Sequence, residues 1–235
     1  MNSMEGRMEA EKVNMPESES RSKPTIEIRY KTDEEISGIM VRCGVSKRFL
    51  AAKKEDINPK IWNQVQGFME GQSIFLHGPP GVGKTHIVVA LMREKIAEDN
   101  EKRITYPANE TEYPVRYYCP TYPRMISVPD LLLEIRECFS GRAGEGEWGL
   151  IEKYAGSRCL IMDDLGVEKT SEWSMQTLYT ITDWRYRELR QTLVTSNLTL
   201  DEIAGKVGDR IASRIAGMCK VVELKGKDRR IKGGS

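Results

Sequence analysis

The sequence lacks the features that would take a protein out of the cytoplasm. None of its apolar runs reaches the roughly 18 residues that a membrane-spanning helix needs, and its polar, acidic N-terminus has no apolar segment typical of signal peptides. The five cysteines are dispersed and form no C-x-x-C pair, which argues against a disulfide framework and a zinc site. We therefore expect a cytoplasmic protein without membrane contacts, whose thiols are mostly buried and reduced.

An excess of charge of one sign is also missing. Lysine and arginine number 36 against 35 aspartates and glutamates, which gives a formal net charge of +1. A protein that coats nucleic acid is usually more basic, so any contact with DNA has to come from a local patch. With 39% hydrophobic and 30% charged residues, the chain can bury a sizeable core beneath a well-solvated surface.

Short apolar stretches alternate with amphipathic ones, which predicts an α/β domain with a parallel sheet and helices on both faces. We expect a flexible or partly ordered segment over 1–40, a globular domain over 41–225 and a basic tail over 226–235. Residues 101–124, rich in proline and tyrosine, are predicted to be an inserted loop or hairpin. Strands are predicted at 73–77, 125–128, 158–163, 191–195 and 219–224, and helices at 36–50, 61–69, 84–98, 130–139, 171–189, 200–204 and 209–218.

A glycine-rich turn after strand 73–77 matches the pattern G-x-x-x-x-G-K-[ST] in full. Its glycines let successive N–H groups turn inward around a phosphate chain, and the helix that follows points its positive end at the same phosphates. Lys84 is predicted to reach the β- and γ-phosphates of ATP, and the Thr85 hydroxyl to ligate Mg²⁺. The residues predicted to bind the nucleotide are Gly78, Pro79, Pro80, Gly81, Val82, Gly83, Lys84, Thr85 and His86.

Two adjacent acids end the apolar strand that follows Arg158. Asp163 is predicted to hold Mg²⁺, usually through water, and Asp164 to orient and deprotonate the attacking water. Adjacent like charges repel each other unless a cation or solvent compensates them, so the pair is more often functional than decorative, although a solvated strand end is the alternative. An acid directly after the metal-binding Asp favours hydrolysis over transfer to a small molecule.

Three further polar residues suit a hydrolytic site. Asn197 follows strand 191–195, where an amide beside the γ-phosphate can position the lytic water, although asparagine is also common in turns. Arg210 and Arg214 lie four positions apart and so share one face of a short helix. An arginine delivered to a neighbour's γ-phosphate stabilises transition-state charge. A solvated helix face is the alternative reading of these two arginines.

Together these residues resemble the DnaC/IstB-type AAA+ ATPases, a family of helicase loaders and transposition helpers. The resemblance covers about residues 45–230 and rests on 83–86 (GKTH), 160–169 (LIMDDLGVEK), 183–186 (DWRY), 195–198 (TSNL) and 210–214 (RIASR). It implies a P-loop NTPase of the AAA+ (ASCE) type, a central parallel sheet flanked by helices, that assembles with itself. It also implies that Arg214 is an arginine finger, that Arg210 supports it and that Asn197 is the first sensor. We expect little or no lid domain, and Arg229 and Arg230 are the candidates for a second sensor.

The resemblance implies an ATPase of slow, partner-stimulated turnover that acts in DNA replication, delivering a replicative ring helicase onto single-stranded DNA. An IstB-like helper ATPase that binds duplex DNA and a transposase is the alternative. A metabolic kinase is disfavoured by Asn197 and the acidic pair, and a module that only holds ATP would tolerate Asp164→Asn. DNA binding rests on the resemblance and on the basic run 225–232, which a solvated tail explains equally well.

Overall fold

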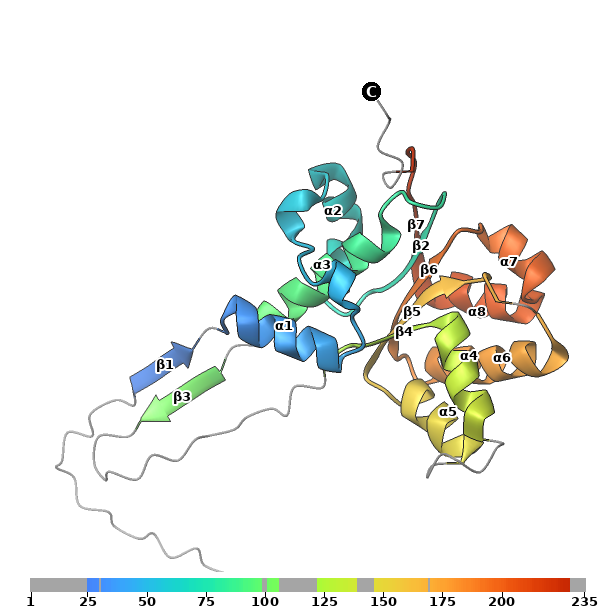
Figure 1. The fold of residues 1–235 in the computed structure, drawn as a ribbon, viewed down its shortest axis with the longest axis horizontal. Coiled ribbons are helices and arrows are strands. Elements are labelled where there is room, and N and C mark those ends of the chain that lie inside the picture. The colour runs from blue at the N-terminus through green and yellow to red at the C-terminus, as the bar shows by residue number, and fades with distance from the viewer. Residues whose placement is uncertain are drawn as a thin grey trace, which may run out of the picture. The chain divides into compact units, whose positions relative to one another are not determined.

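The chain divides into two units that are described separately here (Figure 1). The computed structural model describes residues 25–29, 31–98, 101–105, 122–138, 146–168 and 170–228. In the smaller unit, β1 (Thr25–Arg29) pairs with β3 (Glu101–Thr105) in a two-stranded sheet. No strand was expected within residues 1–40, yet the sequence of β1, TIEIR, alternates polar and β-branched apolar residues as strands do. The described residues leave out most of the predicted insertion and the basic tail beyond Asp228. They also leave out Arg229 and Arg230, the candidates for a second sensor.

The larger unit is built on a five-stranded sheet. Its strands are β2 (Ser73–His77), β4 (Arg124–Ser127), β5 (Cys159–Leu165), β6 (Gln191–Ser196) and β7 (Cys219–Glu223). They lie in the order β4-β5-β6-β2-β7, and each neighbouring pair is parallel. The predicted α/β class with a parallel sheet is therefore confirmed. Because parallel strands end at one edge of the sheet, the loops after β2, β5 and β6 meet there.

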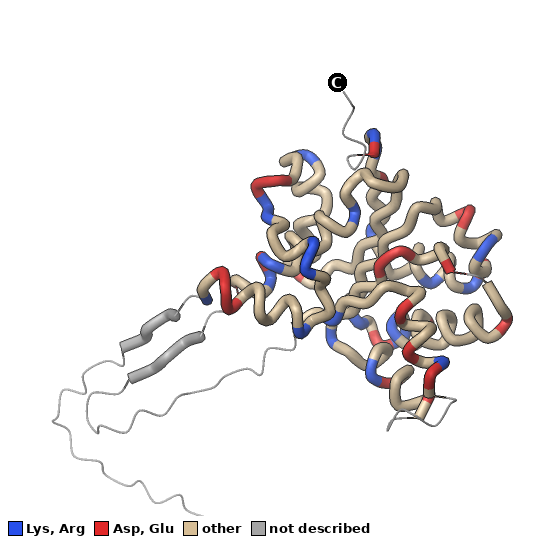
Figure 2. The backbone as a smooth tube through the Cα atoms, viewed as in Figure 1, with Lys and Arg blue, Asp and Glu red and all other residues tan. Residues whose placement is uncertain are grey.

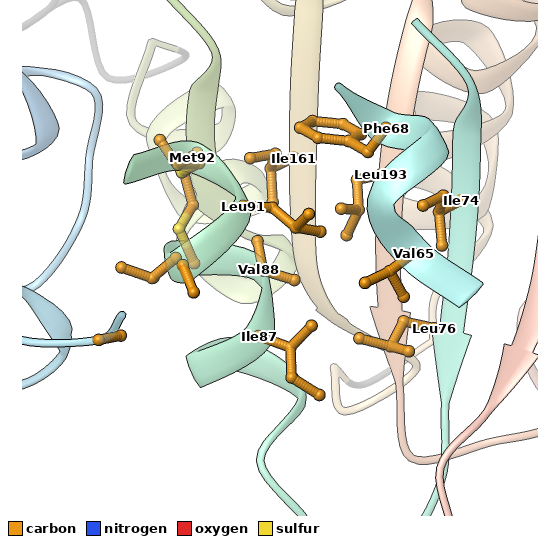
Figure 3. Packing of buried hydrophobic residues seen from close by; sticks show 14 of the residues in the cluster. Val65, Phe68, Ile74, Leu76, Ile87, Val88, Leu91, Met92, Ile161 and Leu193 are labelled. Atoms are coloured by element: carbon orange, nitrogen blue, oxygen red, sulfur yellow. The ribbon is translucent and has the colours of Figure 1, made fainter. Parts of the chain in front are cut away.

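Helices cover both faces of this sheet, and alternate residues of each strand show which helices lie on which face. On β2, Ile74 and Leu76 belong to one core cluster (Figure 3), whereas Phe75 belongs to the cluster on the opposite face. The first face carries α1 (Asp33–Arg42), α2 (Pro59–Val65) and α3 (Lys84–Glu98). The second carries α4 (Val128–Glu137), α5 (Glu147–Ala155), α6 (Glu172–Arg187), α7 (Leu200–Lys206) and α8 (Asp209–Met218).

Side-chain caps explain where several helices begin. Thr32 and Glu35 form a reciprocal capping box, so α1 starts at Asp33, before the predicted start at residue 36. The same helix ends at Arg42, and Lys47–Phe49 is a separate turn of 3₁₀-helix, so the predicted continuous helix to residue 50 is wrong. Ser127 caps α4 through its hydroxyl oxygen, which accepts the N–H of Asp130, and α4 begins two residues before its predicted start.

A buried arginine fixes the N-terminal part of this unit onto α3. Arg93 is only 6% exposed, and its Nε donates to the Ala52 carbonyl over 3.1 Å. Its guanidinium also donates to the Leu50 carbonyl and to Oδ1 of Asp33, the latter over 3.1 Å. The helix that follows the glycine-rich turn therefore also anchors the segment from α1 to Ala52.

None of the described helices is long and apolar enough to cross a membrane.

Candidate nucleotide-binding site

The glycine-rich turn between β2 and α3 depends on close backbone approaches. Gly78 has a φ of +148°, and a Cβ atom there would lie 2.2 Å from the carbonyl oxygen of Leu224, directly after β7. Gly81 has a φ of +72°, and a Cβ atom there would lie 1.7 Å from Oδ1 of Asp228. L side chains rarely adopt such conformations, and at Gly78 the close atom belongs to the backbone, so both positions favour glycine. The same contacts place the segment 224–228 against the turn.

Lys84, the first residue of α3, lies inside this turn. Its side chain is only 5% exposed, and the ammonium donates to the carbonyl oxygens of Gly78 at 2.7 Å and Pro79 at 3.0 Å. It also donates to Oδ1 of Asn197 at 2.6 Å. The structure thus brings together the predicted phosphate-binding lysine and the predicted sensor. Both lie at the edge of the sheet where β2 and β6 end.

Thr85 and Asp163 form the pair of oxygen groups that the sequence predicts for Mg²⁺. The Thr85 hydroxyl lies 3.1 Å from Oδ2 and 3.3 Å from Oδ1 of Asp163, whose residue is only 6% exposed. Burial raises the pKa of the Asp163 carboxyl, a hydrogen bond from Thr195 opposes this rise, and the neighbouring charge of Asp164 adds to it. A buried carboxylate beside a hydroxyl fits a hard divalent cation, whose charge would offset the cost of burial.

Asp164 differs from Asp163 in backbone conformation. Its φ is +59°, in the left-handed region, and its N–H donates to the hydroxyl oxygen of Thr195 at 2.9 Å. The same hydroxyl donates to Oδ1 of Asp163 at 2.5 Å. Thr195 was not among the predicted site residues. Its position two residues before Asn197 is visible in the sequence, but its contacts depend on how β5 and β6 align.

Glu168 is a second residue that sequence reasoning did not select. It is 9% exposed, and its Oε2 accepts the N–H of Gly166 at 3.0 Å, while its Oε1 has no hydrogen-bond partner among the described residues. It closes the turn that follows β5. The presence of a carboxylate in the run LGVE is the only sequence signal for this role.

The two predicted arginines lie on α8, where they contact α6. Arg214 Nε lies 2.7 Å from Oδ1 of Asp183, and its guanidinium lies 5.0 Å from the ring centroid of Tyr186. The hydrogen bond from Arg214 is the main cause that lowers the pKa of Asp183. Arg210 lies over the ring of Tyr179 at 5.9 Å. Within the described part of the chain, these contacts of the two arginines are to α6 and not to the glycine-rich turn. They therefore lie outside the group formed by Lys84, Thr85, Asp163 and Asn197.

His86 was predicted to bind the nucleotide with the rest of the turn. Its Nε2 lies 3.4 Å from Oδ2 of Asp56, in the 3₁₀ turn Lys54–Asp56. The contact joins the first turn of α3 to the segment ahead of α2. His86 thus lies at the border between the glycine-rich turn and the N-terminal part of the unit.

The sequence is similar to those of known bacterial proteins, although no protein-family model matches it. It is 26% identical over 166 residues to the uncharacterized protein YqaM of Bacillus subtilis (strain 168), which covers 68% of this chain and 44% of YqaM. It is 22% identical over 143 residues to the replicative helicase loader DnaC of Escherichia coli (strain K12), which covers 61% of this chain and 49% of DnaC. The chain thus spans about half the length of the curated relatives it matches.

Solved structures share the fold. The crystal structure of the DnaC helicase loader aligns with a TM-score of 0.58 at 22% identity, over 77% of this chain and 100% of that chain. DnaI aligns with a TM-score of 0.59 at 20% identity, over 79% of this chain and 94% of that chain. AMPPCP-bound DnaA from Aquifex aeolicus aligns with a TM-score of 0.55 at 19% identity, over 77% of this chain and 52% of that chain. The chain therefore has the fold of the AAA+ P-loop ATPases and is similar in both sequence and structure to the DnaC-type helicase loaders.

Proposed function

We propose that this chain is a Mg²⁺-dependent ATPase that acts as a helicase loader in DNA replication. The observation that carries the proposal is the convergence of Lys84, Thr85, Asp163 and Asn197 on one glycine-rich turn. The similarity to DnaC and DnaI supports the loader role, and the AMPPCP-bound DnaA neighbour supports a nucleoside triphosphate as the ligand. DnaC is named as a replicative helicase loader and DnaA as a replication initiator, which favours this role over that of a transposition helper.

The residues divide the work of hydrolysis among them. The N–H groups of the turn and the Lys84 ammonium hold the phosphates, and Lys84 exchanges backbone carbonyl oxygens for phosphate oxygens as it does so. Mg²⁺ held by Thr85 and Asp163 would neutralise charge on the β- and γ-phosphates. Asn197 orients a water molecule, and Asp164 accepts its proton as the oxygen attacks the γ-phosphorus. The bond from the γ-phosphorus to the bridging oxygen breaks, which leaves ADP and phosphate.

Self-assembly would supply what a single chain does not place at the turn. Arg214 lies on α8 against Asp183, 32% exposed in its side chain, and can approach the γ-phosphate of a neighbouring subunit. Hydrolysis in one subunit would then be slow until a neighbour contributes Arg214. ATP would hold such an assembly together, and hydrolysis would release the helicase.

Single-stranded DNA is the nucleic acid that we propose for the assembly. Acidic and basic residues are interspersed over the described elements, so DNA contacts have to be local (Figure 2). The chain after β7 is basic in sequence, although Lys225 already pairs with Glu223 at 3.2 Å. Contacts of this kind weaken steeply with salt, so binding is best measured at two salt concentrations.

The test uses purified protein with a replicative ring helicase from the source cell and a labelled circular single strand. We expect ATP-dependent deposition of the helicase on the circle by the unaltered chain and none by Lys84→Ala. Lys60→Ala, which alters an exposed lysine on α2, should behave like the unaltered chain. ATP hydrolysis without any effect on the helicase would contradict the loader role. Preferential binding to duplex DNA together with stimulation by a transposase would favour the helper ATPase instead.

A further inference from the structure

The pairing of β5 with β6 is interrupted at the two acids. The strands are in register from Cys159 opposite Gln191 to Met162 opposite Val194, and the next pair is Leu165 opposite Ser196. Two residues of β5, Asp163 and Asp164, therefore face the single residue Thr195 of β6. This is a β-bulge, which adds a residue to one strand and changes the direction in which its side chains point.

The bulge changes what the strand end can do. Consecutive residues of a regular strand point to opposite faces of the sheet, so a regular β5 would separate its two carboxylates. Asp164 instead adopts a φ of +59°, which non-glycine residues rarely do. Such a conformation persists only where surrounding contacts hold it, and it is found most often at functional sites.

Thr195 makes the contacts that hold the bulge. Its side chain is fully buried, and its hydroxyl donates to Oδ1 of Asp163 at 2.5 Å while accepting the N–H of Asp164 at 2.9 Å. A hydroxyl has one hydrogen to donate, and here it is directed at the carboxylate. The next residue, Ser196, donates to the carbonyl of Leu165 at 2.6 Å and closes the other end of the bulge. Side chains of β6 thus bond to the irregular part of β5 at both of its ends.

We infer that Thr195 is a positioning residue for ATP hydrolysis: its hydroxyl fixes the Asp163 carboxylate toward Thr85 and holds the Asp164 backbone in its left-handed conformation. The inference rests on the proposed ATPase function. The hydroxyl contacts of Thr195 described above are to the two aspartates. It acts through the two aspartates, so its loss should change metal use and turnover more than nucleotide binding itself.

Substitutions of Thr195 by valine and by serine distinguish the effect of losing the hydroxyl from the effect of changing the side-chain shape. Thr195→Val keeps the shape and removes the hydroxyl, Thr195→Ser keeps the hydroxyl, and Thr195→Ala is a second hydroxyl-free variant should valine fold poorly. Thr192→Val is the matched control, because Thr192 lies on the same strand, is equally buried and uses its hydroxyl as an acceptor for Arg185 and a donor to the Arg190 carbonyl. Thermal unfolding establishes that each variant is folded before it is assayed.

The assay measures the affinity for a fluorescent ATP analogue in EDTA, the Mg²⁺ concentration that gives half-maximal tight binding, and kcat. For Thr195→Val we expect unchanged affinity in EDTA, with the Mg²⁺ requirement raised and kcat lowered by about 10- to 100-fold, as for other partners of metal ligands. Thr195→Ser should stay within about three-fold of the unaltered chain on all three measures, and Thr192→Val should lose only thermal stability.

The outcomes separate the two claims. An unaltered chain that neither binds nor hydrolyses ATP would contradict the proposed function, and this inference with it. An active unaltered chain whose Thr195→Val and Thr195→Ala variants keep its Mg²⁺ requirement and kcat would overturn only the role of Thr195. So would a Thr195→Ser variant as impaired as Thr195→Val, because the hydroxyl would then not be the group that matters.

Discussion

The Lys84 ammonium lies 2.6 Å from Oδ1 of Asn197, although 113 positions separate the two residues in the chain. The residue predicted to hold the phosphates and the residue predicted to sense them are therefore in direct contact. Phosphate oxygens that draw Lys84 toward them would change the partner of Asn197 as well. The end of β6 would thus respond to occupancy of the turn without any intervening residue.

Because of this contact, Asn197→Asp tests whether Lys84 and Asn197 interact at the nucleotide-binding site. A carboxylate at this position would pair with Lys84 and compete with the phosphates, so we expect ATP affinity to fall by about ten-fold or more. Asn197→Ala removes the amide without adding charge and should leave affinity within about three-fold while kcat falls by about 100-fold. Titration with a fluorescent ATP analogue and a steady-state assay measure both quantities. Equal affinities of the two variants would argue that Lys84 and Asn197 do not interact in solution.

Asp164→Asn should separate binding from hydrolysis. Asparagine tolerates the left-handed conformation that Asp164 adopts, so the backbone should be preserved while the proton acceptor is lost. We expect ATP affinity within about two-fold of the unaltered chain and a fall in kcat of about 100-fold or more. Single-turnover hydrolysis measures this step directly. Unchanged hydrolysis would mean that Asp164 is not the base.

Arg214 should act on a neighbouring subunit. Arg214→Ala alone is expected to lower kcat of the assembled protein by about 1,000-fold with little effect on ATP binding. Mixing Arg214→Ala subunits, which keep an intact turn, with Lys84→Ala subunits, which keep Arg214, should restore part of the activity. The mixture is compared with each variant alone at the same total concentration. If mixing restores nothing, hydrolysis does not depend on an arginine donated by the Lys84→Ala subunits.

The carboxylate of Asp228 lies against Gly81, within the turn that is proposed to hold phosphates. Like charges oppose each other, so Asp228→Asn should raise ATP affinity by about two- to ten-fold at low salt, and less at high salt. Asp201→Asn, an exposed position on α7, serves as the control and should change nothing. An Asp228→Asn variant that binds ATP as the unaltered chain does at low salt would mean that this carboxylate moves away from the turn in solution.

A buried arginine should contribute strongly to stability. Arg185 is fully buried and donates to the carbonyl oxygens of Tyr154, Ala155, Ser157 and Gln191 and to the hydroxyl of Thr192. Arg185→Met removes a buried donor from each of these acceptors, which should lower the free energy of unfolding by about 2–4 kcal/mol. Arg187→Met, at an exposed position on the same helix, should cost less than about 0.5 kcal/mol. Urea denaturation measures both, and similar losses would contradict the role of Arg185.

Local sequence signals predicted the parts of the fold that local interactions determine. The strand at 73–77 and the helix at 84–98 have the predicted bounds, because a short apolar run, a glycine-rich turn and an apolar stripe of helical period define them without reference to the rest of the chain. The start of α1 was missed, since the capping box formed by Thr32 and Glu35 lies in a polar stretch that was read as loosely ordered.

The features that were not predicted depend on contacts between distant segments. The bulge at Asp163 and Asp164 follows from the register between β5 and β6, which no local pattern encodes. The same applies to the pairing of Arg214 with Asp183 and to the approach of Asp228 to Gly81. Residue types predicted a site that includes Lys84, Thr85, Asp163 and Asn197, which the structure brings together, whereas their hydrogen-bond partners required the three-dimensional arrangement.

The position of β2 has a consequence for how the chain folds as it is synthesised. Among the strands of the central sheet, β2 leaves the ribosome first, yet its neighbours β6 and β7 leave last. Both edges of this apolar strand therefore stay unpaired until β6 and β7 have been synthesised, a condition that slows folding and exposes nascent chains to aggregation. We expect chains that stop before Cys219 to leave one edge of β2 open permanently and to accumulate as insoluble protein.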